Sequence, residues 1–121
     1  MARIIVALLL LLPVAASAGS EADAIMEDME TAIHQGVALS AQGAGFIAQA
    51  GGRESALDQT LREQGREMIA AGKALVVQSA GGDGMQRLHA MDLSETQARR
   101  MMAIHRLESA AMKYLNMLDA P

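Results

Sequence analysis

The sequence predicts an all-α protein, an antiparallel helical bundle of three long helices and one short helix that follows a cleaved signal peptide. Beyond Pro13, the only proline is the last residue, Pro121. No segment alternates apolar and polar residues with the β-branched enrichment that is typical of a strand. Only three stretches interrupt the helix-forming sequence. They are residues 51–52, 81–84 and 92–94.

The first 18 residues have the pattern of a secretory signal peptide. Arg3 precedes an apolar run over residues 4–12, and the small residues 16–18 form an A-x-A cleavage site. The run is shorter than the roughly 20 apolar residues of a membrane-spanning helix, and no cysteine follows Ala18 to carry a lipid. We expect cleavage after Ala18. The mature chain would be periplasmic, without a transmembrane anchor, and form one domain of 121 − 18 = 103 residues over 19–121.

The first long helix is predicted over residues 20–50. Ser20 is a candidate N-cap, with Asp23 as the alternative, and acidic residues in the first turns suit the positive end of the helix dipole. Gly51-Gly52 ends the helix. Apolar and small residues recur at helical spacing along one side: Ile25, Met29, Ala32, Gly36, Leu39, Gly43, Phe46 and Ala50.

The second long helix is predicted over residues 55–80 and ends at Gly81-Gly82. Charged residues decorate one side of it, whereas apolar and small residues form a stripe on the other. The stripe consists of Leu57, Leu61, Gly65, Met68, Gly72, Leu75 and Ser79.

Four glycines inside these two helices indicate how the helices pack. Gly36 and Gly43 are seven residues apart, as are Gly65 and Gly72, and a shift of 29 positions aligns the two pairs as in a duplicated unit. A mid-helix glycine costs about 0.5–1 kcal/mol relative to alanine. We therefore predict a tight antiparallel hairpin with the glycines in the contact. The alternatives are that the glycines have no role or face another subunit.

A short helix over residues 85–91 leads into the last long helix, which is predicted over residues 94–119. Ser94 and Gln97 fit the capping-box pattern that marks a helix start. The predicted core stripe of the last helix is Ile104, Leu107, Ala111, Leu115 and Leu118.

Composition excludes several classes of function. Without Arg3 the chain has 10 − 1 = 9 basic and 14 acidic residues, a formal charge of −5, so we expect no binding to nucleic acid. The absence of cysteine removes disulfides, thiolate metal sites and thiol catalysis. The sequence contains no Gly-rich phosphate loop, no G-x-S-x-G and no H-E-x-x-H, and we expect that the protein is not an enzyme.

Each of the three histidines follows a candidate metal ligand by four residues. The pairs are Glu30 with His34, Met85 with His89, and Met101 with His105. This spacing places both side chains of a pair on one helix face. The last helix has the fullest set, because Glu108 and Met112 continue the same sector. The predicted metal ligands are therefore His105, Met101, Glu108, Met112, His89, Met85 and His34.

Imidazole and thioether groups together favour copper, particularly Cu(I), over harder cations. Nine methionines remain after the initiator, in a chain whose only aromatic residues are Phe46 and Tyr114. Methionine as a filler of the core is the alternative explanation for them. A haem held by His and Met is less favoured, because bulky pocket residues are few.

The segment Leu88-His89-Ala90-Met91-Asp92-Leu93-Ser94-Glu95-Thr96-Gln97 resembles the L-T-x-x-Q motif of the Spy/CpxP family of periplasmic heavy-metal-resistance proteins. Leu93, Ser94 and Gln97 stand at the matching positions, with serine in place of threonine. The resemblance implies an exported all-helical protein that acts as a periplasmic chaperone, a modulator of envelope stress or a metal sensor, often as a hairpin dimer.

We expect a small exported binding protein for a soft metal such as copper, with His105 and Met101 as ligands and His89 or His34 supplied across the bundle or by a second subunit. The alternative is a chaperone-like or protein-interaction module of the envelope stress response, whose Met and Leu surface binds envelope proteins. Helices with narrow Ala and Gly contacts bury little area, so we also expect a homodimer.

Overall fold

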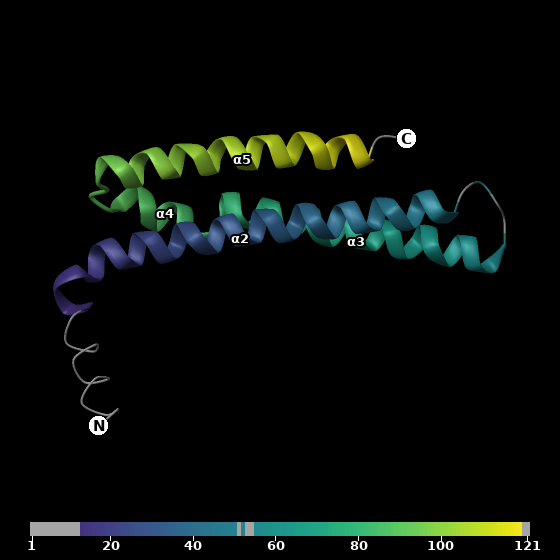
Figure 1. Cartoon of the computed structure of the whole chain (residues 1–121), viewed down its shortest axis with the longest axis horizontal. Helices are drawn as coiled ribbons and strands as arrows, with labels where there is room; N and C mark the ends of the chain where they lie inside the picture. Colours follow the sequence, from purple (N-terminus) through teal and green to yellow (C-terminus); the bar gives the residue numbers. More distant parts are fainter. Residues whose placement is uncertain (1–12, 51, 53–54, 120–121) are drawn as a thin grey trace, which may run out of the picture.

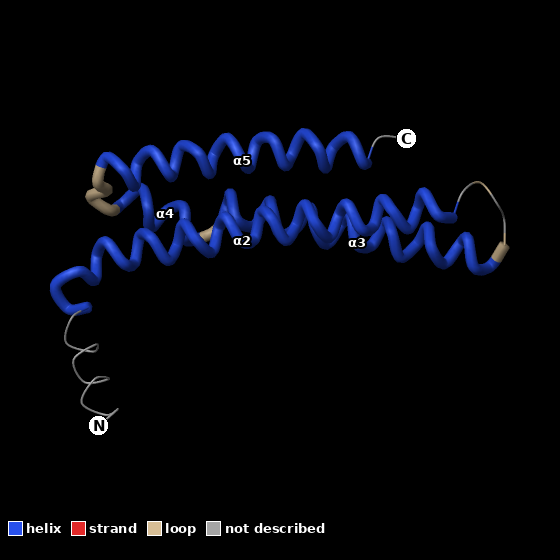
Figure 2. Tube along the Cα trace, viewed as in Figure 1, coloured by secondary structure: helices blue, strands red, loops and turns tan. Residues whose placement is uncertain are grey.

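The computed structural model describes residues 13–50, 52 and 55–119, which form helices and short connections (Figure 1). The helices are α2 (Pro13–Ala50), α3 (Ala56–Gly81), α4 (Asp83–Ala90) and α5 (Glu95–Asp119). No strand occurs within these residues, so the prediction of an all-α chain is confirmed (Figure 2). The predicted order, with the short helix before the last long one, is confirmed as well.

The start of α2 differs from the prediction. The helix runs from Pro13, so Ser20 and Asp23 lie inside it and cap nothing. Proline is accepted in the first helical turn, where its missing N–H has no partner to lose. No glycine or proline interrupts residues 14–18, and the helix therefore continues through them. The apolar run at 4–12 lies outside the described residues. No helix in the described part of the chain is long and apolar enough to cross a bilayer.

Side-chain caps define the starts of α3 and α5. The Asp58 N–H donates to the Ser55 hydroxyl at 3.1 Å, so Ser55 is the N-cap of α3. At α5 the predicted capping box is present. The Gln97 N–H donates to the Ser94 Oγ at 3.1 Å, and the Ser94 N–H donates to the Gln97 Oε1 at 3.0 Å.

α2 and α3 form an antiparallel hairpin (Figure 1). The predicted placement of glycines in the contact is confirmed. A Cβ on Gly36 would lie 2.5 Å from the Gly72 carbonyl oxygen, and a Cβ on Gly65 would lie 2.5 Å from the Gly43 carbonyl oxygen. Ser40 is fully buried in the same contact. Small residues at these positions let the two backbones approach closely.

The contacts of the hairpin follow the 29-residue shift between its helices. The shift exchanges the two glycine pairs, because each member of one pair lies 29 residues from a member of the other. The neighbours obey the same relation: a Cβ on Gly36 would meet Val76, and one on Gly65 would meet Ile47, which lies 29 residues before Val76. α2 and α3 are therefore related by an approximate internal twofold axis, which supports a duplicated helical unit.

The hydrophobic core lies where α4 and α5 pack on one part of the hairpin. It consists of Ala22, Ile25, Met26, Met29, Ile33, Val76, Met85, Leu88, Ile104, Ala111 and Leu115. The predicted stripe of α5 is confirmed, since Ile104, Ala111 and Leu115 are buried and the other two members pack against them.

The predicted stripe of α3 is only half right. Gly65 and Gly72 are buried, but Leu57 is 69% exposed, and the other fully buried positions are Asp58, Ile69 and Val76. The physical reason is that α3 packs against α2 through its glycines and against α5 through the flank that carries Val76. The opposite flank, which carries most of the predicted stripe, is left without a helix over it.

Candidate functional site

The structure brings two of the three histidines together. His89 is the last residue but one of α4, and His105 lies in the first half of α5. Their ring centroids are 6.4 Å apart, and the ring planes are inclined by 33°. Both side chains are exposed to solvent. An ion in solution therefore has direct access to both rings.

Buried neighbours fix the position of each ring. Leu88 precedes His89 and Ile104 precedes His105, and both apolar side chains are at most 1% exposed in the core. An ion pair between Arg87 and Glu21 of α2 fastens the same turn of α4. The two histidines thus project from backbone segments that the core holds in place, which limits the reorganisation needed to bind a ligand.

The separation of the rings matches what a shared ion requires. An imidazole nitrogen binds a metal at about 2.0–2.1 Å and the ring centre lies about 1 Å behind it, so two rings on opposite sides of one ion have centroids about 6 Å apart. The observed 6.4 Å meets this requirement without movement of the helices. The same distance also falls in the range of ordinary contacts between aromatic rings.

The thioether groups are mostly part of the core. Met26, Met29 and Met85 are buried, and Met91, Met101 and Met112 pack against the core from its edge. Only Met102 and Met117 are largely exposed among the methionines that the structure describes, with 54% and 74% of their surface accessible. The interpretation of methionine as core filler therefore holds for most of these residues. Met101 remains the thioether nearest in sequence to His105 on one helix face.

Glu108, another predicted ligand, is only partly buried, but its Oε2 atom is fully buried and has no hydrogen-bond partner in the described structure. A buried carboxylate oxygen without a partner is unfavourable and attracts a proton or a cation. No group of three or more His, Asp or Glu side chains is close enough to hold one ion in residues 13–50, 52 and 55–119. Glu108 is therefore not joined to the histidine pair.

His34 lies in a different environment. It lines an apolar groove of about 220 Å³ between α2 and α5, opposite Tyr114 and Leu107. The absence of a three-member His, Asp or Glu group in the described chain means that His34 does not join His89 and His105. The third predicted histidine is thus available as an internal comparison for the other two.

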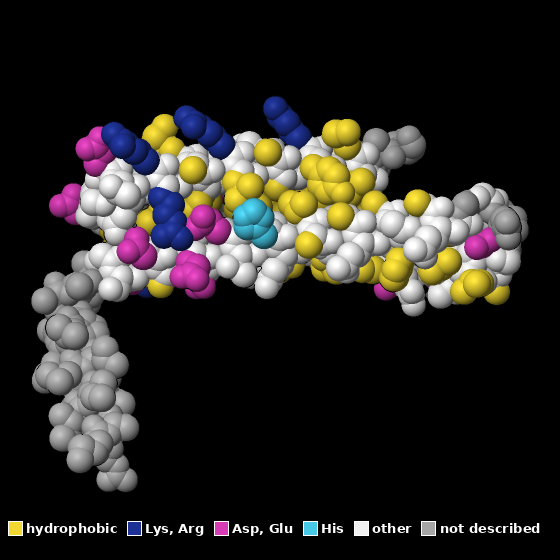
Figure 3. Space-filling view, in the orientation of Figure 1, with side chains coloured by type: hydrophobic (Ala, Val, Ile, Leu, Met, Phe, Trp, Pro, Cys, Tyr) yellow, Lys and Arg dark blue, Asp and Glu magenta, His cyan; other side chains and the backbone are white. Residues whose placement is uncertain are grey.

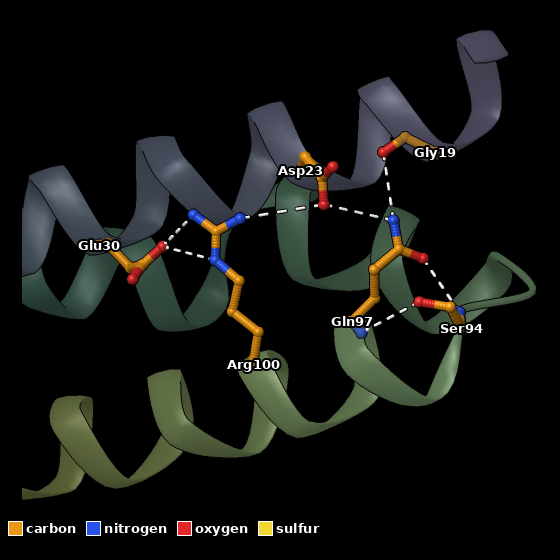
Figure 4. A network of polar contacts seen from close by, with 6 residues as sticks. All are labelled: Gly19, Asp23, Glu30, Ser94, Gln97 and Arg100. Carbon is orange, nitrogen blue, oxygen red and sulfur yellow. Dashed lines mark hydrogen bonds and ion pairs between the residues drawn. The ribbon is translucent and has the colours of Figure 1, made fainter.

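A polar network joins the N-terminal part of α2 to the start of α5 (Figure 4). The Arg100 guanidinium donates to the Glu30 Oε1 at 2.9 and 2.5 Å, and it lies 3.9 Å from Asp23. Gln97 donates from its amide to the Gly19 carbonyl at 3.2 Å and to Asp23 at 3.3 Å. Sequence reasoning assigned these acidic residues only to the helix dipole. The clustered arginines at 99–100 were the available signal for a cross-helix partner.

No protein-family model matches the chain, and neither a curated protein nor a solved structure is significantly similar to it. Function is therefore assigned on the geometry of the residues described above, and the histidine pair across α4 and α5 is the feature with the clearest chemical use.

Proposed function

We propose that the chain is an exported, non-enzymatic protein that binds one soft monovalent metal ion, Cu(I) or the similar Ag(I), between His89 and His105. The approach of their two rings to 6.4 Å from separate helices is the observation that carries the proposal. Imidazole is a suitable ligand for copper, and Cu(I) and Ag(I) accept two nitrogen ligands in a nearly linear arrangement.

The ligands around the pair favour a soft ion over a hard one. Mg²⁺ and Ca²⁺ need six or more oxygen ligands, and structural Zn²⁺ needs four protein ligands. The described residues offer two imidazoles without a third His, Asp or Glu beside them. Met101, one helical turn before His105, is the thioether that would complete the coordination of a copper ion after a change of rotamer.

Export is part of this proposal. A thiol-free chain suits an oxidising compartment, and the pattern of residues 1–18 is that of a signal peptide. Gly19, which would become the first residue after cleavage, carries the carbonyl that accepts the Gln97 amide. Cleavage after Ala18 would therefore keep every contact drawn in Figure 4. Mass determination of the protein from the periplasm of an expressing bacterium tests this step, with a chain starting at Gly19 as the expected result.

Titration with Ag(I), and with Cu(I) under reducing conditions, tests the metal site. We expect one ion per chain and at least a tenfold loss of affinity for His89→Ala and for His105→Ala, which corresponds to about 1.4 kcal/mol or more. His34→Ala is the matched control, because it removes an exposed histidine that lies outside the pair. Equal binding by all four proteins would refute the proposal.

The second candidate function is that of a protein-interaction module. One observation favours it. The flank of the hairpin away from α5 carries half-buried apolar side chains that no other described helix covers. Suppression of the aggregation of a model client by metal-free protein would support a chaperone-like role, and client binding unaffected by changes on this flank would argue against it.

A further inference from the structure

The α2–α3 hairpin has an apolar face on the side away from α5. We define this hairpin face by six half-buried residues, which are Ala32, Leu39 and Phe46 of α2 and Leu61, Met68 and Leu75 of α3. None of them is among the partly buried residues that pack against the core. In Figure 3, hydrophobic side chains are visible along the edge of the hairpin that points away from α5.

Two grooves show that α5 leaves this side open. The groove between α2 and α5 is lined from α2 by Ile33, His34 and Val37. Leu39 lies about 200° round the helix from Val37, at 100° per residue. On the other side, Ala32 and Leu75 line a groove of about 300 Å³ between α2 and α3 to which α5 contributes no residue.

The hairpin face repeats itself. Ala32, Leu39 and Phe46 are spaced by seven residues, and the 29-residue shift maps them onto Leu61, Met68 and Leu75 in that order. The internal twofold axis that relates the glycine pairs therefore also relates the two apolar stripes. A seven-residue spacing keeps each stripe on nearly one side of its helix, as in helices that pack along their length.

The hairpin face is uncharged. No Asp, Glu, Lys or Arg occurs between Glu30 and Arg53, and the charged residues of α3 lie outside the stripe at 61, 68 and 75. The flanking polar residues are exposed glutamines. They are Gln35, Gln42, Gln49, Gln64 and Gln78. In a chain with 24 charged residues, a charge-free face of this length favours a partner that is uncharged at its own contact.

We propose that the hairpin face binds the same face of a second copy of the chain and forms a twofold-symmetric dimer with a four-helix interface. An interface of this kind needs a patch that is complementary to itself. Two equivalent apolar stripes meet this need, because either stripe of one copy can pack on either stripe of the other. Glutamine both donates and accepts hydrogen bonds, so the flanking rows can pair with identical rows. A lipid surface is less suited, since interfacial helices carry Lys and Arg beside their apolar side.

The size of the face agrees with a weak but specific dimer. A stripe from 32 to 46 extends over about 21 Å at 1.5 Å per residue, and two helices 8–10 Å apart present a face about 20 Å wide. Each copy would bury about 500–600 Å², which gives a total near the lower limit of about 1,200 Å² for stable interfaces. Phe46, the only phenylalanine, would provide an aromatic anchor at one end.

Sedimentation velocity and light scattering over a wide range of protein concentration test the dimer. We expect a concentration-dependent monomer–dimer equilibrium for the wild type and monomers for Leu39→Glu and Met68→Glu. Met102→Glu is the matched control, because it places the same charge on an exposed methionine of α5 and should leave the dimer intact. Circular dichroism establishes that each variant is folded. Phe46→Ala, which adds no charge, should weaken the dimer by at least fivefold.

Two results would overturn the proposal. The first is a wild type that stays monomeric at every concentration, including one that instead binds vesicles of anionic or neutral phospholipid. The second is a dimer that persists in both folded glutamate variants, because the contact would then lie elsewhere. Neither result bears on the histidine pair, whose titration is separate.

Discussion

Gly36 and Gly72 face each other across the α2–α3 contact so closely that a Cβ on Gly36 would lie 2.5 Å from the carbonyl oxygen of Gly72. The obstacle is backbone, which cannot turn aside as a flexible side chain can. The core residues of α4 and α5 pack on this hairpin, so the separation of its two helices determines whether the core forms.

Gly72→Ala should destabilise the protein strongly. The added Cβ would overlap the Ser40 hydroxyl and the Gly36 carbonyl oxygen, and relief requires that α2 and α3 move apart. We expect a loss of about 2–4 kcal/mol in the free energy of unfolding, in the range of overpacked or cavity-forming core changes. Urea unfolding followed by circular dichroism measures it.

Gly45→Ala is the control for that change. Gly45 also lies inside α2, but a Cβ there would have nothing within 4 Å. Alanine is the better helix former, so this variant should gain about 0.5–1 kcal/mol. Losses of similar size in both variants would show that helix geometry, rather than the close approach, explains the glycines.

Arg100 should contribute more to stability than its neighbour Arg99. Arg100 and Glu30 are about one-third exposed, whereas Arg99 and Glu95 are more than three-quarters exposed. Ion pairs in solvent contribute little because water and salt screen them. We expect a loss of about 1 kcal/mol for Arg100→Ala and less than about 0.5 kcal/mol for Arg99→Ala. Urea unfolding at low and high salt compares them, and equal losses would contradict a role for the network in Figure 4.

Gln97 has two separable roles, and Gln97→Glu should remove only one of them. A carboxylate can still accept from the Ser94 N–H, as in the usual capping box. It cannot donate to the Gly19 carbonyl, and it would face the Asp23 carboxylate. We expect a loss of about 1 kcal/mol. The added variant Asp23→Asn, whose amide can donate to the new carboxylate, should restore most of it. Failure of this rescue would mean that the cross-helix contact is not the cause.

Local signals predicted most of the helix boundaries. The glycines after Ala50 and the caps at Ser55 and Ser94 act within a few residues of themselves, so the sequence contains all that determines them. The start of α2 was wrong for a related reason. Ser20 is a good cap only where the preceding chain leaves the helix, and nothing before it interrupts the helix as far as Pro13.

Features that depend on how helices pack were harder to predict. The glycine contact was predicted because four costly glycines at one spacing require a common cause. The outward orientation of Leu57 was not predicted, because it depends on the flank of α3 that α5 covers. In the same way, the spacing within α5 indicated His105 as a ligand, but the approach of His89 depends on the angle between α4 and α5. The sequence offered His34 and His89 equally, and the fold brings His105 to only one of them.

Glu108→Gln should stabilise the protein and thereby define the extent of the metal site. The buried Oε2 atom of Glu108 has no hydrogen-bond partner in the described structure, and an unpaired buried polar group costs about 1–3 kcal/mol, more if charged. An amide of the same shape is neutral, so we expect a gain of about 0.5–1 kcal/mol in the free energy of unfolding, measured in urea.

The same variant separates a two-histidine site from a larger one. Because Glu108 is not grouped with His89 and His105, its carboxylate should not contact the ion, and Ag(I) affinity should stay within about threefold of the wild type, less than 0.7 kcal/mol. A loss of tenfold or more would mean that α5 turns or shifts on binding so that Glu108 reaches the ion. The comparison is informative because Glu108 and His105 share one flank of α5, one helical turn apart. Stability and affinity are measured separately, so a gain in the first cannot conceal a loss in the second.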